Sequence, residues 1–340
     1  ENDGDISPGN TSLREAINRV GKDGVTKVIF DESFNGKQIT LTSPLVINKD
    51  IVIDGGDKVT LSGGEETTIF KITSGNVEIK NITLRDGLSQ GGKGGGPSRF
   101  RSHGAGGGGA GLGGAIAIRN GNVLLEGVSF INNKAIGGNG GSANKMEHVL
   151  DTFWDINKDM SGYGGSSVLG SGASRTVWGN SSSGKNGGLG GGGGGSINYD
   201  NGAKGGNGGF GGGGGGGDAG GFRRSSRGLG GLGGSFAGSG GNGAGGNNDT
   251  MNYLAGGGGG GAGLGGAVYI HDGILTARDC EFERNSAVGG VGGTGATKGT
   301  DGQGVGGAIF VQKDAIFNFR GGVTYGSNSA QTSDANYYIR

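Results

Sequence analysis

Three ionisable side chains occupy positions where they could act together on a sugar acid. Arg119 and His271 follow two copies of one repeated strand motif, and Asp272 comes directly after His271. Because side chains alternate along a strand, Arg119, His271 and Gln312 are expected in one outward column if the copies stack. A base beside an arginine and a carboxylate could remove a proton from an acidic sugar. The sequence has no group of several Asp at strand spacing, so a solvated outer face is favoured over a catalytic site.

A second stretch has the spacing of a calcium loop. Asp155, Asn157 and Asp159 place oxygen ligands at alternate positions. An EF-hand requires Gly at its sixth position and Glu at its twelfth, where this stretch has Met160 and Ser166. A polar turn is therefore favoured, and calcium is kept as the candidate cofactor.

Basic loops that contain an aromatic residue are the candidate ligand-binding elements. Exposed rings beside Arg suit recognition of a sugar or a protein. The same rings could equally anchor a glycine-rich segment, which has little else to pack. The candidate ligand-binding residues are Arg99, Phe100, Arg101, Trp154, Trp178, Phe222, Arg223 and Arg224.

Two further features of the sequence are better explained by core packing or by chance than by catalytic activity. Cys280 aligns with the apolar residues Ile82 and Val128 of other repeat copies, so it is expected in the core as a small apolar group. The stretch Gly87–Gly91 fits the G-x-S-x-G pattern of a nucleophile elbow, which requires a following helix. The sequence GKGGGP that follows cannot form one, so a chance match is favoured.

Composition excludes several classes of protein. The chain has 340 residues with 93 Gly and 3 Pro, and the Gly follows no G-X-Y period, which excludes collagen. Lys plus Arg and Asp plus Glu number 29 each, so the basic excess of a general nucleic-acid binder is missing. One Cys excludes an internal disulfide, and no apolar run is long enough to span a membrane. Because the chain begins at Glu1 without a signal peptide, we expect it to be part of a longer polypeptide.

The elements that must position these residues are one helix and many short strands. Ser12 and Glu15 form a capping box, and the apolar stripe predicts a helix over residues 13–20. After this helix, apolar residues recur at every second position, which predicts strands, and Asn, Asp and Gly separate one strand from the next. The strands are expected at residues 28–30, 38–42, 45–47, 51–53, 59–61, 69–72 and 76–84.

An internal repeat defines how these strands stack. The motif at Gly106–Ile118 returns at Gly258–Ile270, and a looser copy starts at Gly304. Short stacked units without intervening helices predict an all-β fold, a right-handed parallel β-helix with a short N-terminal capping helix. The Asn residues that end the units are expected to tolerate a left-handed turn and to form hydrogen-bonded ladders. These residues are Asn133, Asn285 and Asn328.

The glycine-rich region divides the chain into three parts. Residues 1–136 hold the cap and the first rungs, residues 137–262 a long glycine-rich insertion, and residues 263–340 the last rungs. The insertion is either a disordered linker or a set of packed polyglycine-II strands, which have three residues per turn. The regular return of the motif favours order.

The repeat also resembles that of a known family. SLREAIN (Ser12–Asn18) resembles the N-terminal signature of large bacterial β-helix surface proteins. The pairs GGAI with FINN (Gly113–Asn133) and GGAV with FERN (Gly265–Asn285) resemble the repeats of chlamydial polymorphic outer membrane proteins. This resemblance implies a secreted adhesin with a pectin-lyase-like parallel β-helix passenger, outside the cell or associated with the outer membrane.

These observations favour a non-enzymatic surface protein over an enzyme. The expected partner is a glycan or protein on a host or neighbouring cell, with neither nucleic-acid binding nor a membrane span. The alternative is a β-helix lyase, hydrolase or epimerase that acts on an acidic polysaccharide through Arg119, His271 and Asp272. Such enzymes work from the outer face of the same fold.

Overall fold

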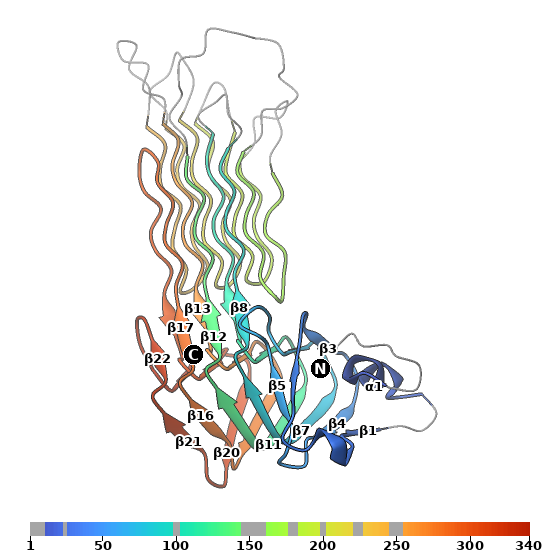
Figure 1. Cartoon of the computed structure of the whole chain (residues 1–340). Coiled ribbons are helices and arrows are strands. Elements are labelled where there is room, and N and C mark those ends of the chain that lie inside the picture. Colours follow the sequence, from blue (N-terminus) through green and yellow to red (C-terminus); the bar gives the residue numbers. More distant parts are fainter. Residues whose placement is uncertain are drawn as a thin grey trace, which may run out of the picture.

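The computed structural model describes residues 11–22, 26–97, 103–143, 161–175, 183–197, 202–219, 227–244 and 254–340. They form two parts that we call the body and the bundle (Figure 1). The body consists of short parallel strands, and the bundle is an array of extended glycine-rich segments that rises from one side of it.

The body begins with the expected helix. Helix α1 (Leu13–Arg19) is capped by Ser12, whose hydroxyl accepts from the amide of Glu15 while the Glu15 carboxylate accepts from the amide of Ser12. Its apolar stripe buries Leu13 and Ile17 against the first strands. The capping box that the sequence predicts is therefore confirmed. A short 3-10 helix, η1 (Glu32–Phe34), follows β1.

All named strand pairs in the body are parallel and belong to four sheets. The ten-stranded sheet contains β1 (Lys27–Ile29), β2 (Gln38–Thr40), β4 (Ile51–Asp54), β5 (Thr60–Ser62), β7 (Asn76–Arg85), β11 (Asn122–Ile131), β15 (Ile274–Arg278), β16 (Glu281–Glu283), β20 (Ile316–Arg320) and β21 (Thr324–Gly326). The six-stranded sheet contains β3 (Leu45–Ile47), β6 (Phe70–Ile72), β10 (Ile116–Ile118), β14 (Val268–Ile270), β19 (Ile309–Val311) and β23 (Tyr337–Ile339). The smaller sheets contain β8 (Leu88–Gln90), β12 (Lys134–Ile136), β17 (Ser286–Val288) and β22 (Ser329–Ala330), and β9 (Gly111–Leu112), β13 (Gly263–Leu264) and β18 (Gly304–Val305).

The chain visits these sheets in a repeating order, which agrees with the predicted repeat. It runs from β9 through β10 and β11 to β12, and from β13 through β14, β15 and β16 to β17. The two copies of the motif are direct neighbours: β10 pairs with β14, with Ile116 opposite Val268. The architecture is thus nearly all-β with several parallel sheets, and it is compatible with a β-helix.

Apolar residues at alternate strand positions fill the interior between the sheets. Val77, Val123 and Leu275 lie in register, and Phe130 stacks on Phe282 with ring centroids 4.7 Å apart. Cys280 is buried beside them, as predicted, and burial raises the pKa of its thiol to about 11. The thiol therefore stays protonated and acts as an apolar group.

An asparagine ladder fixes the corner between the ten-stranded and four-stranded sheets. The Asn285 Oδ1 atom accepts from the amide and the side chain of Asn133, and Asn328 Oδ1 accepts in the same way from Asn285. The ladder is confirmed, although the left-handed backbone lies one residue earlier, at Asn132 and Arg284. The Asn side chains therefore serve the ladder, and the residue before each one makes the turn.

The bundle is built from glycine-rich segments that leave and re-enter the body. The first row holds residues 91–97, 137–143 and 289–295, and the second holds 103–110, 161–166, 254–262 and 297–303. The third row holds 170–175, 191–197, 212–219 and 238–244, and the fourth holds 183–189, 202–209 and 227–234. The predicted insertion supplies most of these segments, and residues 91–110 and 289–303 add two shorter excursions to the same array (Figure 1).

Backbone hydrogen bonds in the bundle change direction with a period of three residues. In segment 103–110 the amides of Gly107, Gly108 and Gly109 donate to three different neighbours, over 2.8–2.9 Å. Gly104, three residues before Gly107, donates to the same neighbour as Gly107, segment 191–197. The period of three is that of a polyproline-II-type helix. The described part of the insertion is therefore an ordered array and not a linker.

Glycine is required in the interior of this array because neighbouring backbones touch. A Cβ added at Gly107 or Gly213 would overlap a backbone carbonyl of the adjacent segment. At the perimeter, where a neighbour is missing, polar side chains accept from amides instead. Asn139, Asn186, Asn207, Asn242 and Asp301 each accept from an amide of an adjacent segment over 2.8–3.0 Å.

Candidate binding surface at the distal end of the bundle

The end of the bundle far from the body is the candidate functional surface. In one row the chain runs away from the body, and in the next row it returns. Every segment therefore has one of its ends at this distal end of the bundle (Figure 1). The described residues that border this end are Pro97, His103, Ala143, Ser161, Arg175, Ser183, Ile197, Gly202, Ala219, Arg227, Ala244 and Leu254. All the connections predicted to bind a ligand start and end at this border.

Two buried side chains are in contact where one of these connections ends and another begins. His103 and Asp218 lie 3.7 Å apart between Nδ1 and Oδ1, and both side chains are about 4% exposed. Neither ring nitrogen of His103 has a hydrogen-bond partner among the described residues. His103 is the last residue of the basic stretch 98–103, and Asp218 lies four residues before the basic stretch 222–227. The fold therefore brings His103 and Asp218, which border two different predicted binding connections, into contact, and the sequence did not predict this contact.

A second contact near this end pairs an aromatic ring with an arginine. The guanidinium of Arg175 lies over the ring of Tyr163, with 5.0 Å to the ring centroid. The ring also packs over Gly95, where an added Cβ would collide with it. Tyr163 thus covers a glycine segment at the bundle edge, which is the anchoring role that the composition suggested for aromatic residues.

The predicted ligand-binding and calcium residues lie outside the part of the chain that the structure describes. This applies to Arg99, Phe100, Arg101, Trp154, Trp178, Phe222, Arg223 and Arg224, and to Asp155, Asn157 and Asp159. Within the described residues, no group of three His, Cys, Asp or Glu side chains could hold a metal ion.

The outward column predicted on the body is formed in part. The register places Arg119 beside His271 and His271 beside Gln312, because the strands before them pair residue for residue. Arg119 and Asp272 are exposed, and His271 is half-buried, with its Nδ1 atom 3.4 Å from the Tyr269 hydroxyl. Burial lowers the pKa of His271, the Arg119 charge lowers it further, and Asp272 and Asp314 oppose the shift.

An aromatic column lies beside these residues, on the outer face that was expected to be solvated. Tyr269 and Phe310 point outward from β14 and β19, yet they are fully buried. Turns of the insertion cover them: Phe210 lies 6.1 Å from Phe310, and Phe236 lies 5.4 Å from it, between ring centroids. The expected solvated face is therefore a second apolar cluster that joins bundle and body. Strand alternation identified the outward side chains but could not show what packs on them.

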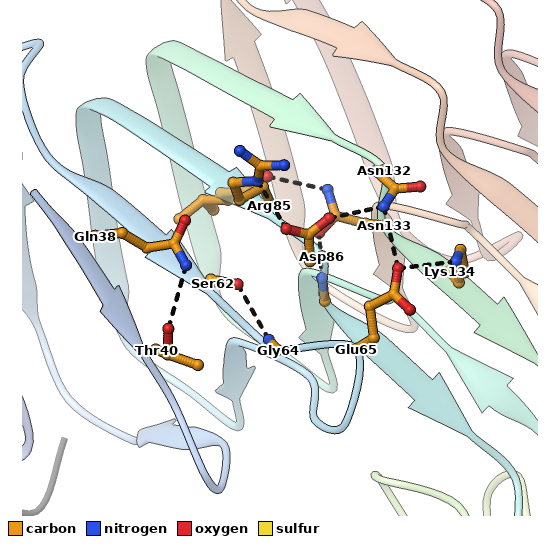
Figure 2. Close-up of polar contacts among 12 residues, drawn as sticks. Gln38, Thr40, Ser62, Gly64, Glu65, Arg85, Asp86, Asn132, Asn133 and Lys134 are labelled. Atoms are coloured by element: carbon orange, nitrogen blue, oxygen red, sulfur yellow. Dashed lines mark hydrogen bonds and ion pairs between the residues drawn. The ribbon is translucent and has the colours of Figure 1, made fainter. Parts of the chain in front are cut away.

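Carboxylates on another face of the body form hydrogen bonds and ion pairs with neighbouring side chains (Figure 2). Asp86 accepts from the Asn132 side chain over 2.7 Å and pairs with Arg85 over 2.7 Å. Glu65 accepts from Lys134 over 3.2 Å and from Asn132 over 3.3 Å. These contacts link adjacent turns of the chain at the corner that holds the asparagine ladder, so we assign them to the fold.

Comparisons with known proteins give no further assignment, because no family model, no curated protein and no solved structure matches this chain. Among the described residues, none of the helices has the length and apolar character needed to cross a membrane.

Proposed function

We propose that this chain is a non-enzymatic, adhesin-like protein that is secreted or displayed at a cell surface. In this proposal the parallel sheets are the faces of a right-handed β-helix, and each turn of the chain is one rung. The bundle holds the connections that bind the ligand away from this β-helix. The ligand is a glycan or a protein on another surface. The observation that carries the proposal is that the described residues flanking the predicted binding connections lie together at the distal end of one ordered glycine array.

The bundle has the rigidity that such a display requires. Segment 103–110 donates to three neighbours and accepts from three others, so its position is fixed from all sides. Binding residues act best when a rigid scaffold holds the connections that carry them. The His103–Asp218 contact supports the proposal because it joins two segments that border basic, aromatic-containing stretches of the sequence.

The enzyme alternative rests on Arg119, His271 and Asp272. The register brings Arg119 and His271 together. However, the neighbouring aromatic side chains are covered by the turns at Phe210 and Phe236, which narrows the surface where a polysaccharide would lie. We therefore rank adhesion first, and product assays on alginate and pectin test the alternative.

A binding screen tests the proposed function directly. The whole chain is applied to a glycan array and to host cells, beside a variant in which residues 98–102 and 220–226 are replaced by Gly-Ser of equal length. We expect binding by the unaltered chain and at least about a tenfold loss in the variant. A control variant carries Gly-Ser at Lys313 and Asp314, on an exposed turn of the body. No binding, together with turnover of a polyuronate, would overturn the proposal.

A further inference from the structure

Four cations lie on segments that follow one another around the edge of the bundle. Arg175, Lys185, Lys204 and Arg227 belong to segments 170–175, 183–189, 202–209 and 227–234, and we call them the basic collar. Backbone hydrogen bonds connect each segment to the next: Gly188 to Ser171, Gly184 to Lys204, and Gly205 to Leu229, over 2.8–3.1 Å. The collar therefore follows one continuous stretch of the perimeter.

The four cations also lie at a similar height, close to the distal end. Lys185 Nζ donates to the hydroxyl of Ser174, the residue before Arg175, over 3.2 Å. The amide of Gly184 donates to the carbonyl of Lys204 itself. Arg227 precedes Gly228, whose amide donates to Asp218, and Asp218 in turn donates to Ala203. Each cation is thus within a residue or two of a hydrogen bond that leads to the next segment, and all four side chains are exposed.

The collar segments are rich in cations and poor in anions. The described residues of those segments contain no Asp or Glu. In the rest of the described bundle, Asp218 is buried beside His103, and Asp301 pairs with Lys298 over 3.0 Å. On the body, by contrast, cations pair with carboxylates, as Lys27 does with Asp54. Among the described residues, this edge of the bundle therefore carries four cations and no carboxylate on its own segments.

We infer that the basic collar binds an acidic polysaccharide, with its cations on successive carboxylate or sulfate groups. The inference rests on the proposed function and names its ligand class. Neighbouring segments lie about 5 Å apart when joined by backbone hydrogen bonds, so the collar presents a row of closely spaced charges. Arg binds carboxylate and sulfate through a planar fork, and Lys acts as a point charge. The collar adds an aliphatic surface at Leu229, which is 57% exposed and suits the C–H face of a sugar ring.

Nucleic acid is the less suitable polyanion for this surface. Proteins that bind single strands combine a basic track with aromatic side chains on which bases stack. The collar segments expose Leu229 and Leu232. We therefore choose the polysaccharide and make nucleic acid an outcome of the test.

The test compares two variants of the whole chain with matched charge changes. The collar variant is Lys185→Gln with Lys204→Gln and Arg227→Gln, and the control is Lys22→Gln with Lys58→Gln and Lys313→Gln on the body, all exposed. Binding to alginate, heparin and neutral dextran is measured by calorimetry at low and at physiological salt. We expect the unaltered chain to bind alginate or heparin and not dextran, with binding weakened by salt. The collar variant should lose about tenfold or more in affinity, and the control should stay within about twofold.

The other outcomes separate this inference from the proposed function. If a neutral glycan or a cell receptor binds and the collar variant binds it equally well, the collar inference is wrong while the proposed function stands. If single-stranded DNA displaces the polysaccharide at equal concentration of charge, the assignment to polysaccharide is wrong. If the folded chain binds neither polyanions, glycans nor cells, both proposals fail. Circular dichroism of each variant verifies that the fold is unchanged.

Discussion

At the scale of single residues, the polar side chains that the structure buries are those that serve two adjacent turns of the chain. Asn285 is fully buried and bonds to Asn133 on one side and to Asn328 on the other. Its Nδ2 atom also donates to the carbonyl of Phe130 over 3.0 Å. A buried amide is stable only when its donors and acceptors are satisfied, and the ladder satisfies them on both sides.

Replacing the middle residue of the ladder should therefore be costly. Asn285→Ala leaves the buried amide of Asn133 without an acceptor and removes one of the two acceptors of its Nδ2 atom, so we expect the free energy of unfolding to fall by about 3 kcal/mol. Urea denaturation followed by circular dichroism measures the change. Asn328→Ala is the matched control, because Asn328 is half-buried at the end of the ladder, and should cost about 1 kcal/mol. Equal losses in both variants would contradict the ladder argument.

His271 should make stability depend on pH in a defined direction. Burial lowers its folded-state pKa below the ordinary value of 6.5, so the unfolded chain binds the proton more readily. The contribution of His271 is then complete above pH about 6.5 and is lost as the pH falls from there to the folded-state pKa. Denaturation between pH about 5 and 8 should show a slope that His271→Gln reduces. A slope of unchanged size in the variant would assign the dependence to other groups.

At the scale of elements, the bundle segments are held by backbone contact and the body strands by side-chain packing. Four strands of the six-stranded sheet bring Ala117, Tyr269, Phe310 and Tyr338 into one outward column. Turns of the insertion then bury this column with Phe210 and Phe236. The bundle therefore attaches to the body through aromatic contacts, while its own interior excludes side chains.

A methyl group in the bundle interior should disrupt the array. In Gly213→Ala the new Cβ would overlap the carbonyl oxygen of Gly259, and two fixed backbones cannot separate without breaking hydrogen bonds. We expect a loss of about 3 kcal/mol and faster amide exchange across the neighbouring segments. Gly188→Ala at the exposed edge is the control, because its nearest atom to an added Cβ lies 3.3 Å away, and should stay within about 1 kcal/mol. A Gly213→Ala variant as stable as the control would show that the segments are loosely packed.

At the scale of the whole molecule, a long excursion separates two strands that are direct neighbours. Asn133 and Asn285 are 152 residues apart in the sequence and share a hydrogen bond of 2.9 Å. Ala143 and Ala255, at the two ends of the longest stretch of the excursion, belong to one small buried cluster. The excursion could therefore be shortened without moving the strands that flank it.

Removing residues 144–254 and joining the ends by a short Gly-Ser turn should leave the body folded. The far-ultraviolet circular dichroism should keep its β character, because β10 still pairs with β14. The deletion removes Phe210 and Phe236, so Tyr269 and Phe310 become exposed and the variant should bind the dye ANS and self-associate. Changing Tyr269 and Phe310 to Ser in the shortened chain should reverse both effects. Loss of all β structure would show instead that the excursion is needed for the body to fold.

The repeat of the body could be predicted from the sequence because its apolar residues carry positional information. The return of the motif of Gly106–Ile118 at Gly258–Ile270, the cap at Ser12 and the burial of Cys280 all follow from local spacing, and the structure confirms them. Each strand position faces either inward or outward, so a shift of one residue would bury the wrong set.

The bundle and the candidate site, by contrast, were decided by tertiary structure. A run of glycines can form a helix with three residues per turn, but it has no side chains that select a neighbour. The sequence therefore could not show which segments are in contact. That choice depends on where each segment leaves the body, and it placed His103 beside Asp218 and assembled the basic collar from four separate stretches. The signal that the sequence did offer was a charged or ring-bearing residue at the end of a glycine run, such as Arg175 or Arg227. Such a residue can lie only at the end or the edge of the array, because the interior has no space for its side chain.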